Sequence, residues 1–354
     1  MKVLHIANLD KFIPPFIGFL RENNLAEGHF FFTYGDLNKY QYTVLSDSYH
    51  ANSDESTSLL AKIRYRYLKL LIFMYKADSI LIHGLNDFNL ILMLFLNPCL
   101  HKKINWVIWG GDLYEKDFLE KNTKSKEYIL KQFIKSSVIK RIGYLISYLD
   151  GDVRYAREKY GARGKYKKCI MYLSNVFDSE YIRPNRNSEN NELNILVGNS
   201  ADPENHHYEI FNKIGSKENV VIIAPLSYGI KGYAQEVIVA GKNSFGNNFK
   251  PITQLMPIED YNDLLNSVDI AVFNHKRQQA MGTTITLLGL GKTVYLRRDT
   301  PQWETLTSLG IALLDIDDFS FTVLSKYESE ENMRIVKKEF STESLIHQFS
   351  NLFS

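Results

Sequence analysis

The chain has 354 residues, of which 45% are hydrophobic and 23% are charged, an ordinary soluble globular composition that is long enough for two domains of comparable size. Its formal net charge is +2, but residues 1–180 carry 26 basic against 19 acidic side chains, whereas residues 181–354 carry 16 against 21. The basic first half favours an anionic partner such as a membrane or a lipid diphosphate, and the lack of a reader motif or a basic stripe excludes nucleic acid.

The first half alternates between strand-like and helix-like patterns. The pattern predicts strands over 2–7, 29–33, 42–45, 79–83 and 104–109, and helices ending near residue 23 and over 59–75, 88–96 and part of 126–148. The helices over 59–75 and within 126–148 mix basic with apolar side chains. They either lie on an anionic bilayer or pack on the sheet with snorkelling lysines, and the pattern leaves both open.

Several features predict the compartment. No segment reaches about eighteen apolar residues without a charge, and the N-terminus lacks the pattern of a signal peptide. Cys99 and Cys169 are far apart and belong to no Cys/His cluster, which excludes a zinc site or a disulfide framework and favours a reducing compartment. We therefore expect a cytosolic protein that could rest on a membrane surface.

A second α/β pattern follows a polar segment, 178–193, that is typical of a linker. It predicts strands over 194–197, 220–224, 270–273 and 293–296 and a helix over 257–268. The sequence thus predicts an α/β protein with domains over 1–180 and 193–335. A C-terminal helix, 336–354, is expected to pack back on the first domain.

The stretch 269–296 has the order strand, loop, helix, strand of a parallel α/β sheet, whose ligands bind beyond the carboxyl ends of the strands. Its loop offers donors from Arg277 and Gln278, and Gly282 allows close backbone approach. Thr283 or Thr284 would cap the following helix, whose N-terminus favours an anion. The stretch predicts a phosphate or diphosphate site, and the alternative is a solvated loop with ordinary capping.

Two further loops of the second half are predicted to reach the same edge of the sheet. They are 198–200, which contains Asn199 and Ser200, and 227–229, which contains Tyr228. Together the three loops could hold a nucleoside diphosphate, with Arg277 at the diphosphate and Tyr228 near the base or ribose.

In the first half, three candidate functional residues follow predicted strands: Asp10, His83 and Asp112. His83 could be a base near neutral pH, or a half-buried, hydrogen-bonded histidine. Asp112 and Glu115 have the spacing of a capping box for a helix beginning at Leu113, which does not exclude a functional role. Asp150 and Asp152 form an Asp-x-Asp motif that could bind a metal, or a turn followed by a helix.

Three motifs jointly resemble one bacterial family, the TDP-N-acetylfucosamine:lipid II N-acetylfucosaminyltransferases of enterobacterial common antigen synthesis. They are WVIWGGDLYE over 106–115, ILVGNSAD over 195–202 and RQQAMGT over 277–283. His83-Gly84, Pro225 to Tyr228 and Pro301-Gln302-Trp303 are also similar and occur in the same order. The resemblance spans nearly the whole chain and is weakest over 36–78 and the last thirty residues.

The resemblance implies a GT-B glycosyltransferase with two Rossmann-like domains facing across a cleft, the donor in the second, the acceptor in the first, and no required metal or other cofactor. It also implies an acceptor linked to undecaprenyl diphosphate. Matched to the motifs, the donor diphosphate would contact Asn199, Ser200, Arg277, Gln278, Gly282 and Thr283. Trp109, Asp112 and Tyr114 would lie on the acceptor side, as would Asp10, and the base would be Asp112 or His83.

We therefore expect an enzyme that moves a deoxy-amino sugar, N-acetylfucosamine (Fuc4NAc), from a dTDP-sugar donor to a polyprenyl-diphosphate glycan of common antigen or O-antigen synthesis. Three alternatives stay open. They are a GT-B transferase with another nucleotide sugar, a metal-dependent transferase that uses Asp150 and Asp152, and a non-catalytic nucleotide- or glycan-binding protein.

Overall fold

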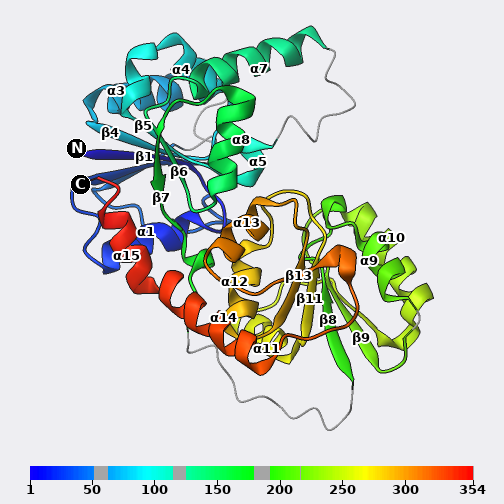
Figure 1. Ribbon diagram of the computed structural model, residues 1–354. Helices are drawn as coiled ribbons and strands as arrows, with labels where there is room; N and C mark the ends of the chain where they lie inside the picture. Colours follow the sequence, from blue (N-terminus) through cyan, green and yellow to red (C-terminus); the bar gives the residue numbers. More distant parts are fainter. Residues whose placement is uncertain (52–62, 115–124, 179–191, 216, 354) are drawn as a thin grey trace. The chain divides into compact units, whose positions relative to one another are not determined.

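The computed structural model describes residues 1–51, 63–114, 125–178, 192–215 and 217–353 (Figure 1). The chain forms two compact units: unit 1 comprises Met1–Ser174 and Ile346–Ser354, and unit 2 comprises Asn175–Leu345. The division therefore falls before the predicted linker, most of which, 179–191, lies outside the described residues, as does Glu115.

The described part of unit 1 contains a parallel sheet of seven strands in the order β3-β2-β1-β4-β5-β6-β7. The strands are β1 Val3–Asn8, β2 His29–Tyr34, β3 Ser48–Ala51, β4 Ser79–His83, β5 Ile104–Val107, β6 Tyr144–Ser147 and β7 Lys165–Lys168. Central strands such as β1 and β5 are buried along almost their whole length, because helices cover both faces of a parallel sheet.

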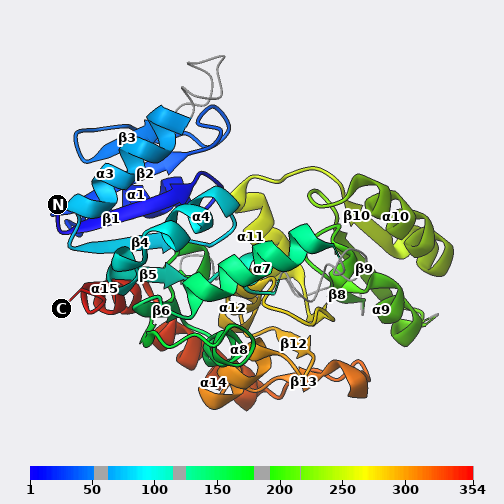
Figure 2. The same ribbon diagram turned by 90° about the horizontal axis from the view of Figure 1, so that it is seen from above.

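The helices of unit 1 cover the two faces unequally. They are α1 Ile13–Glu22, a π-helix Ile63–Leu68 that continues into α3 Lys69–Lys76, α4 Phe88–Leu96, a 3-10 helix Pro98–Lys103, α5 Gly110–Leu113, α7 Lys126–Ile139 and α8 Asp150–Tyr160. One face carries α3, α4 and α7 with α4 in the middle, and the opposite face carries α1 (Figures 1 and 2).

The C-terminal residues 346–354 pack with α1 on that opposite face. Phe349 contacts the rings of Phe16 and His29. The backbone N–H of Ile170 donates to Gln348 Oε1 at 2.9 Å, and Lys167 donates to the carbonyl of Leu352. Residues 336–345, in contrast, cluster with unit 2.

Unit 2 contains a parallel sheet in the order β10-β9-β8-β11-β12-β13. The strands are β8 Leu193–Val197, β9 Val220–Pro225, β10 Phe249–Ile252, β11 Ile270–Phe273, β12 Thr293–Leu296 and β13 Leu314–Asp315. Its α-helices are α9 His207–Ile214, α10 Lys231–Phe245, α11 Ile258–Ser267, α12 Met281–Gly289, α13 Pro301–Ser308 and α14 Lys326–Glu339, and α15 is Thr342–Ser350. Short 3-10 turns lie at Pro203–Asn205, Gly246–Asn248 and Ile316–Asp318.

Both sheets reverse their strand order once, between β1 and β4 in unit 1 and between β8 and β11 in unit 2. Ligands of doubly wound α/β sheets bind beyond the carboxyl ends of the strands at this switch point. The prediction of an α/β protein is confirmed. Across the described ranges, no helix combines the length and the hydropathy needed to cross a membrane.

One predicted strand was wrong, and another ends two residues earlier than predicted. Residues 42–45 form a loop, and the edge strand is β3, which pairs in parallel with β2 from Phe31↔Ser48 to Tyr34↔Ala51. Val44 and Leu45 are exposed, so their apolar character reflects no buried strand. The predicted strand over 104–109 ends at Val107, because Gly110 already belongs to the short helix α5.

Candidate functional site

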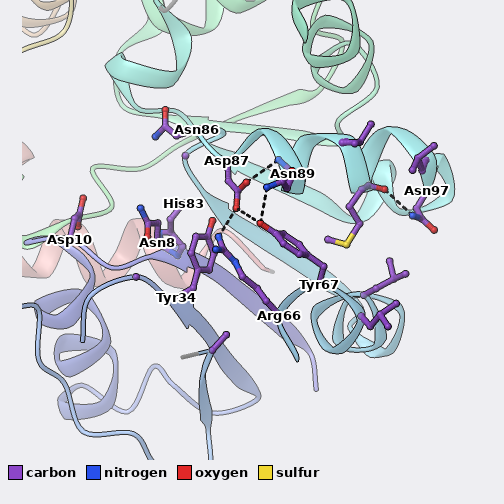
Figure 3. Close-up of a pocket in the computed structure, with 18 of the residues that line it drawn as sticks. Asn8, Asp10, Tyr34, Arg66, Tyr67, His83, Asn86, Asp87, Asn89 and Asn97 are labelled. Atoms are coloured by element: carbon purple, nitrogen blue, oxygen red, sulfur yellow. Dashed lines mark hydrogen bonds and ion pairs between the residues drawn. The ribbon is translucent and has the colours of Figure 1, made fainter. Parts of the chain in front are cut away.

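A groove of about 980 Å³ lies at the switch point of unit 1 (Figure 3). One end is formed by residues at the carboxyl ends of β1, β2 and β4, among them Asn8, Tyr34 and His83. From there the groove passes between the π-helix with α3 on one side and α4 on the other, where its lining becomes apolar. The groove therefore joins a polar end at the strand termini to an apolar end between two helices.

Asp10 lies at the polar end of this groove, close to Asn8 and His83 (Figure 3). Its Oδ1 accepts from the backbone N–H groups of Phe12 at 2.8 Å and Ile13 at 3.3 Å, which holds the carboxyl group at the start of α1. Burial raises the pKa of Asp10 above its ordinary value. A positioned carboxylate with a raised pKa, lining a groove at a switch point, can accept a proton from a bound hydroxyl group.

His83 also lines the groove, but both of its ring nitrogens are used in a hydrogen-bonded chain. Trp109 Nε1 donates to Tyr172 Oη at 2.9 Å, and Tyr172 Oη shares a hydrogen bond of 2.6 Å with His83 Nδ1. On the other side of the ring, His83 Nε2 shares a hydrogen bond of 3.1 Å with His5 Nδ1. Burial lowers the pKa of His83 to about 3. Of the two possibilities that the sequence left open, the structure shows the buried, hydrogen-bonded histidine, whose charged form burial disfavours.

Asp112 is fully buried and binds three donors. Its Oδ2 accepts from the backbone N–H of Leu85 at 2.6 Å and from Trp106 Nε1 at 2.7 Å, and its Oδ1 accepts from the backbone N–H of Trp109 at 2.8 Å. Burial raises its pKa to about 6. Asp112 is thus the third residue of α5 rather than its N-cap, and its hydrogen bonds hold the Trp109 loop against the residues after β4. Its role as a base stays a prediction.

Tyr114 is not among the residues that line the groove, and its place beside the acceptor stays a prediction. Its ring packs in the core of unit 1 against Tyr155, and its hydroxyl donates to Asp152 Oδ1 at 2.7 Å. Asp152 is fully buried, whereas the side chain of Asp150 is half-exposed and lies 3.9 Å from Lys168. Both residues lie in the first turn of α8, which is the turn followed by a helix that the sequence left open beside metal binding. Metal independence itself stays a prediction.

The buried carboxyl of Asp152 gives the first testable prediction. Burial raises its pKa to about 7 in the folded protein, against an ordinary value near 4. The folded state therefore holds a proton that the unfolded state releases between about pH 4 and 7, so stability falls as the pH rises through this window and levels off above it. The loss can reach about 4 kcal/mol, and it should shrink in Asp152→Asn.

The measurement is the free energy of unfolding by urea at pH 5 and pH 8 for the wild type and for Asp152→Asn. Asp150→Asn is the matched control, since its half-exposed side chain lies two residues away. A pH slope that is the same in all three proteins would contradict the prediction.

In unit 2, the three loops predicted to share one edge of the sheet converge. Asn199 Nδ2 donates to Tyr228 Oη at 2.9 Å, and Gln279 Nε2 donates to Asn199 Oδ1 at 2.9 Å. Gly198 opens the first loop with φ +66°, and a Cβ there would lie 2.8 Å from His207 Nε2, so the position requires glycine. The loops after β8, β9 and β11 thus form one polar surface at the switch point of unit 2.

Arg277 lies on this surface and is held by Asp202, a residue that the sequence analysis did not assign to the site. The Arg277 Nη2 to Asp202 Oδ2 distance is 2.9 Å, and both side chains are partly buried. Asp202 Oδ1 also accepts from the backbone N–H of Glu204 at 3.0 Å, which fixes the carboxylate. Ser200 is buried beneath the same surface, with its hydroxyl 3.2 Å from Asn205 Nδ2, and Gln278 lies between Arg277 and Gln279 in the loop.

Helix α12 begins at Met281, two residues earlier than predicted, so neither Thr283 nor Thr284 caps it. Thr283 Oγ1 lies 3.0 Å from Tyr261 Oη, and Thr284 is buried. The N-cap is Ala280, with φ +58°, and no side chain of the described residues caps the helix there. The first turn, with Gly282 half-buried in it, therefore keeps backbone N–H groups that can bind an anion.

The sequence analysis also missed residues at the carboxyl ends of β11 and β12. Asn274 donates from Nδ2 to Glu209 Oε2 at 2.8 Å and accepts from Arg297 at 3.3 Å. Gln302 Oε1 accepts from His275 Nε2 at 2.6 Å, while Gln302 Nε2 donates to the carbonyl of Gln279. Gln302 had been noted only as part of a motif. Its contacts fix the loop that carries Arg277.

Comparison with known families identifies one match. The family described as 4-alpha-L-fucosyltransferase, glycosyl transferase group 56, matches residues 69–342. This range includes the groove residues after β4 and all three loops of unit 2.

Comparison with solved structures shows the fold. Sucrose-phosphate synthase from Thermosynechococcus elongatus has a TM-score of 0.69 at 11% identity, covering 100% of this chain and 98% of that one. HepE from Anabaena, solved with UDP and glucose, has a TM-score of 0.68 at 10% identity and coverage of 99% and 98%. WaaG, a glycosyltransferase of lipopolysaccharide biosynthesis, has a TM-score of 0.59 at 12% identity and coverage of 99% and 93%. The prediction of the GT-B fold is confirmed.

Proposed function

The chain belongs to glycosyl transferase group 56, and we propose that it transfers Fuc4NAc from a dTDP-sugar donor to a glycan carried on a polyprenyl diphosphate. Glycosyl transfer itself follows from the family. The proposed reaction takes place at the cytoplasmic leaflet of a bacterial inner membrane. It belongs to the synthesis of common antigen or O-antigen.

The donor half of the proposal is supported by the surface of unit 2 that combines Arg277 with the uncapped start of α12. The leaving group of a nucleotide-sugar donor is a nucleoside diphosphate, on which negative charge develops as the bond to the sugar breaks. A guanidinium and backbone N–H groups stabilise this charge in the transition state and require no bound metal. HepE, which has the same fold, was solved with UDP-glucose.

The acceptor half is supported by Asp10 in the groove of unit 1. In an inverting transfer a base removes the proton of the acceptor hydroxyl while its oxygen attacks the anomeric carbon and the diphosphate leaves. Asp10 lines the groove and has a raised pKa, whereas His83 lacks a free ring nitrogen and Asp112 is fully buried. We assign the base to Asp10, and the other two become positioning residues.

The test is a transfer assay with a short-chain polyprenyl-diphosphate disaccharide and three donors: dTDP-Fuc4NAc, GDP-fucose and UDP-glucose. Mass spectrometry of the product should show transfer from dTDP-Fuc4NAc at a rate that EDTA does not change. Transfer only from GDP-fucose would favour the second candidate, a fucosyl donor, which the family's description suggests. Tight nucleotide binding without turnover would instead indicate a binding protein.

A further inference from the structure

Helix α4 is apolar around its whole circumference, yet the protein covers only part of it. Its sequence, FNLILMLFL, contains a single polar residue, Asn89. Leu90, Ile91 and Leu94 are buried, but Leu92 and Met93 are only partly covered and Leu96 is 68% exposed. A helix that is apolar on every side is normally buried, so the uncovered side of α4 is suited to an apolar ligand.

The uncovered side of α4 faces the groove. Leu92, Met93 and Leu96 line it from α4, and Leu68 and Leu71 line it from the facing helices. The two mouth residues, Leu68 and Leu96, are 53% and 68% exposed. From the N-cap Asp87 to Leu96 this apolar part extends for about 14 Å, given the rise of an α-helix.

The mouth of the groove opens beside other exposed apolar residues. Ile72 and Tyr75 on α3 and Ile129, Leu130 and Phe133 on α7 are at least half-exposed. Helix α4 lies between α3 and α7, and Phe133 contacts the ring of Phe95 (Figure 2). The same two helices also carry basic side chains, Lys69 on α3 and Lys131 on α7. This combination of apolar and basic side chains complements an anionic lipid surface.

The lining of the groove changes from polar to apolar at Arg66, the one cation among the described residues that line it. Its guanidinium stacks on Tyr34 at 3.8 Å from the ring centroid and pairs with Asp87 Oδ2 at 2.6 Å (Figure 3). Asp87 uses its other oxygen to cap α4, so it holds Arg66 at the boundary between the polar and apolar ends. If the anionic group of a lipid-linked sugar binds Arg66, its sugars lie toward Asp10 and its lipid chain lies toward Leu96.

From this arrangement we infer that the groove between α3 and α4 binds the isoprenoid chain of the acceptor, which enters at Leu68 and Leu96, with the diphosphate at Arg66. The inference rests on the proposed function for the identity of the lipid. It adds the path of the chain, and it makes the groove, rather than the general apolar surface, the element that recognises the lipid.

The test measures binding of farnesyl diphosphate by calorimetry, with inorganic diphosphate as the head-group control. Leu68→Ser/Leu96→Ser should weaken binding at least tenfold, because two partly exposed leucines lose contact with the chain. Ile72→Ser/Leu130→Ser is the matched control, since these residues are 56% and 58% exposed but lie outside the groove lining. The control should change the Kd less than twofold. All four positions are exposed, so both variants should keep the wild-type Tm.

Arg66→Gln distinguishes recognition of the diphosphate head group from recognition of the isoprenoid chain. It should weaken binding of farnesyl diphosphate but leave binding of farnesol, which lacks the diphosphate, within twofold of the wild type. Equal losses in the mouth variant and its control, or no binding of farnesyl diphosphate to the wild type, would overturn the inference. The assay needs neither donor nor turnover. Prenyl binding without transfer would therefore count against the proposed function alone, and transfer to a chainless acceptor without prenyl binding against the groove alone.

Discussion

Asp10→Asn is expected to lower kcat by a factor of about 10² to 10⁴, which is the usual contribution of a general base. The substitution replaces only one carboxylate oxygen by an amide nitrogen. Asparagine caps helices about as well as aspartate, so Oδ1 can still accept from the N–H groups of Phe12 and Ile13. The Tm should therefore stay near that of the wild type, and the loss is chemical rather than structural.

The pH profile of kcat distinguishes a base from a residue that only positions the acceptor. Only ionised Asp10 can take the proton, so the wild-type rate should rise with pH through the pKa of Asp10, which burial raises above its ordinary value. This limb should disappear in Asp10→Asn. Full activity of the variant would exclude Asp10. His83→Gln is the comparison: it should leave the pH limb in place, because both ring nitrogens of His83 are already engaged in hydrogen bonds, with Tyr172 and His5.

The α/β class and the polar surface of unit 2 were predictable because they depend on local patterns. Buried strands give continuous apolar runs that can be recognised in the sequence. The loops after these strands carry Asn199, Tyr228 and Arg277, and the strand order brings the loops together at the switch point. The convergence of these loops follows from topology alone. The resemblance to the family added the chemistry that topology does not supply.

The burial of Asp112 and Tyr114 was not predictable, because it depends on contacts with other parts of the chain. Asp112 is buried by donors from Leu85 and Trp106, and Tyr114 is turned into the core by Asp152, 38 residues away. Nothing in the motif that contains them shows which side of the loop faces the groove. The start of α12 was misplaced for a different reason: the N-cap is Ala280 with a positive φ, which no capping preference predicts.

Arg277→Ala is expected to lower kcat/KM for the donor by 10² to 10³ and to abolish the rise in Tm that a nucleoside diphosphate gives the wild type. The guanidinium contributes a charge that backbone N–H groups at α12 cannot replace. Thermal shifts with dTDP and initial rates with the sugar donor measure the two effects. Arg298→Ala is the matched control, because Arg298 is an exposed arginine of the same unit that pairs with Asp315.

Asp202 decides how the result for Arg277 is interpreted. Asp202→Asn can keep its one oxygen as the cap for the N–H of Glu204, but it replaces Oδ2, the acceptor for Arg277 Nη2, by an NH2 group. Because Arg277 keeps its charge, the substitution should cost less than tenfold in kcat/KM. If Asp202→Asn were as damaging as Arg277→Ala, the ion pair would serve mainly to shape the loop, since loss of either partner would have the same effect. A large effect of Arg277→Ala alone would instead mean that the guanidinium acts on the donor directly and that Asp202 only orients it.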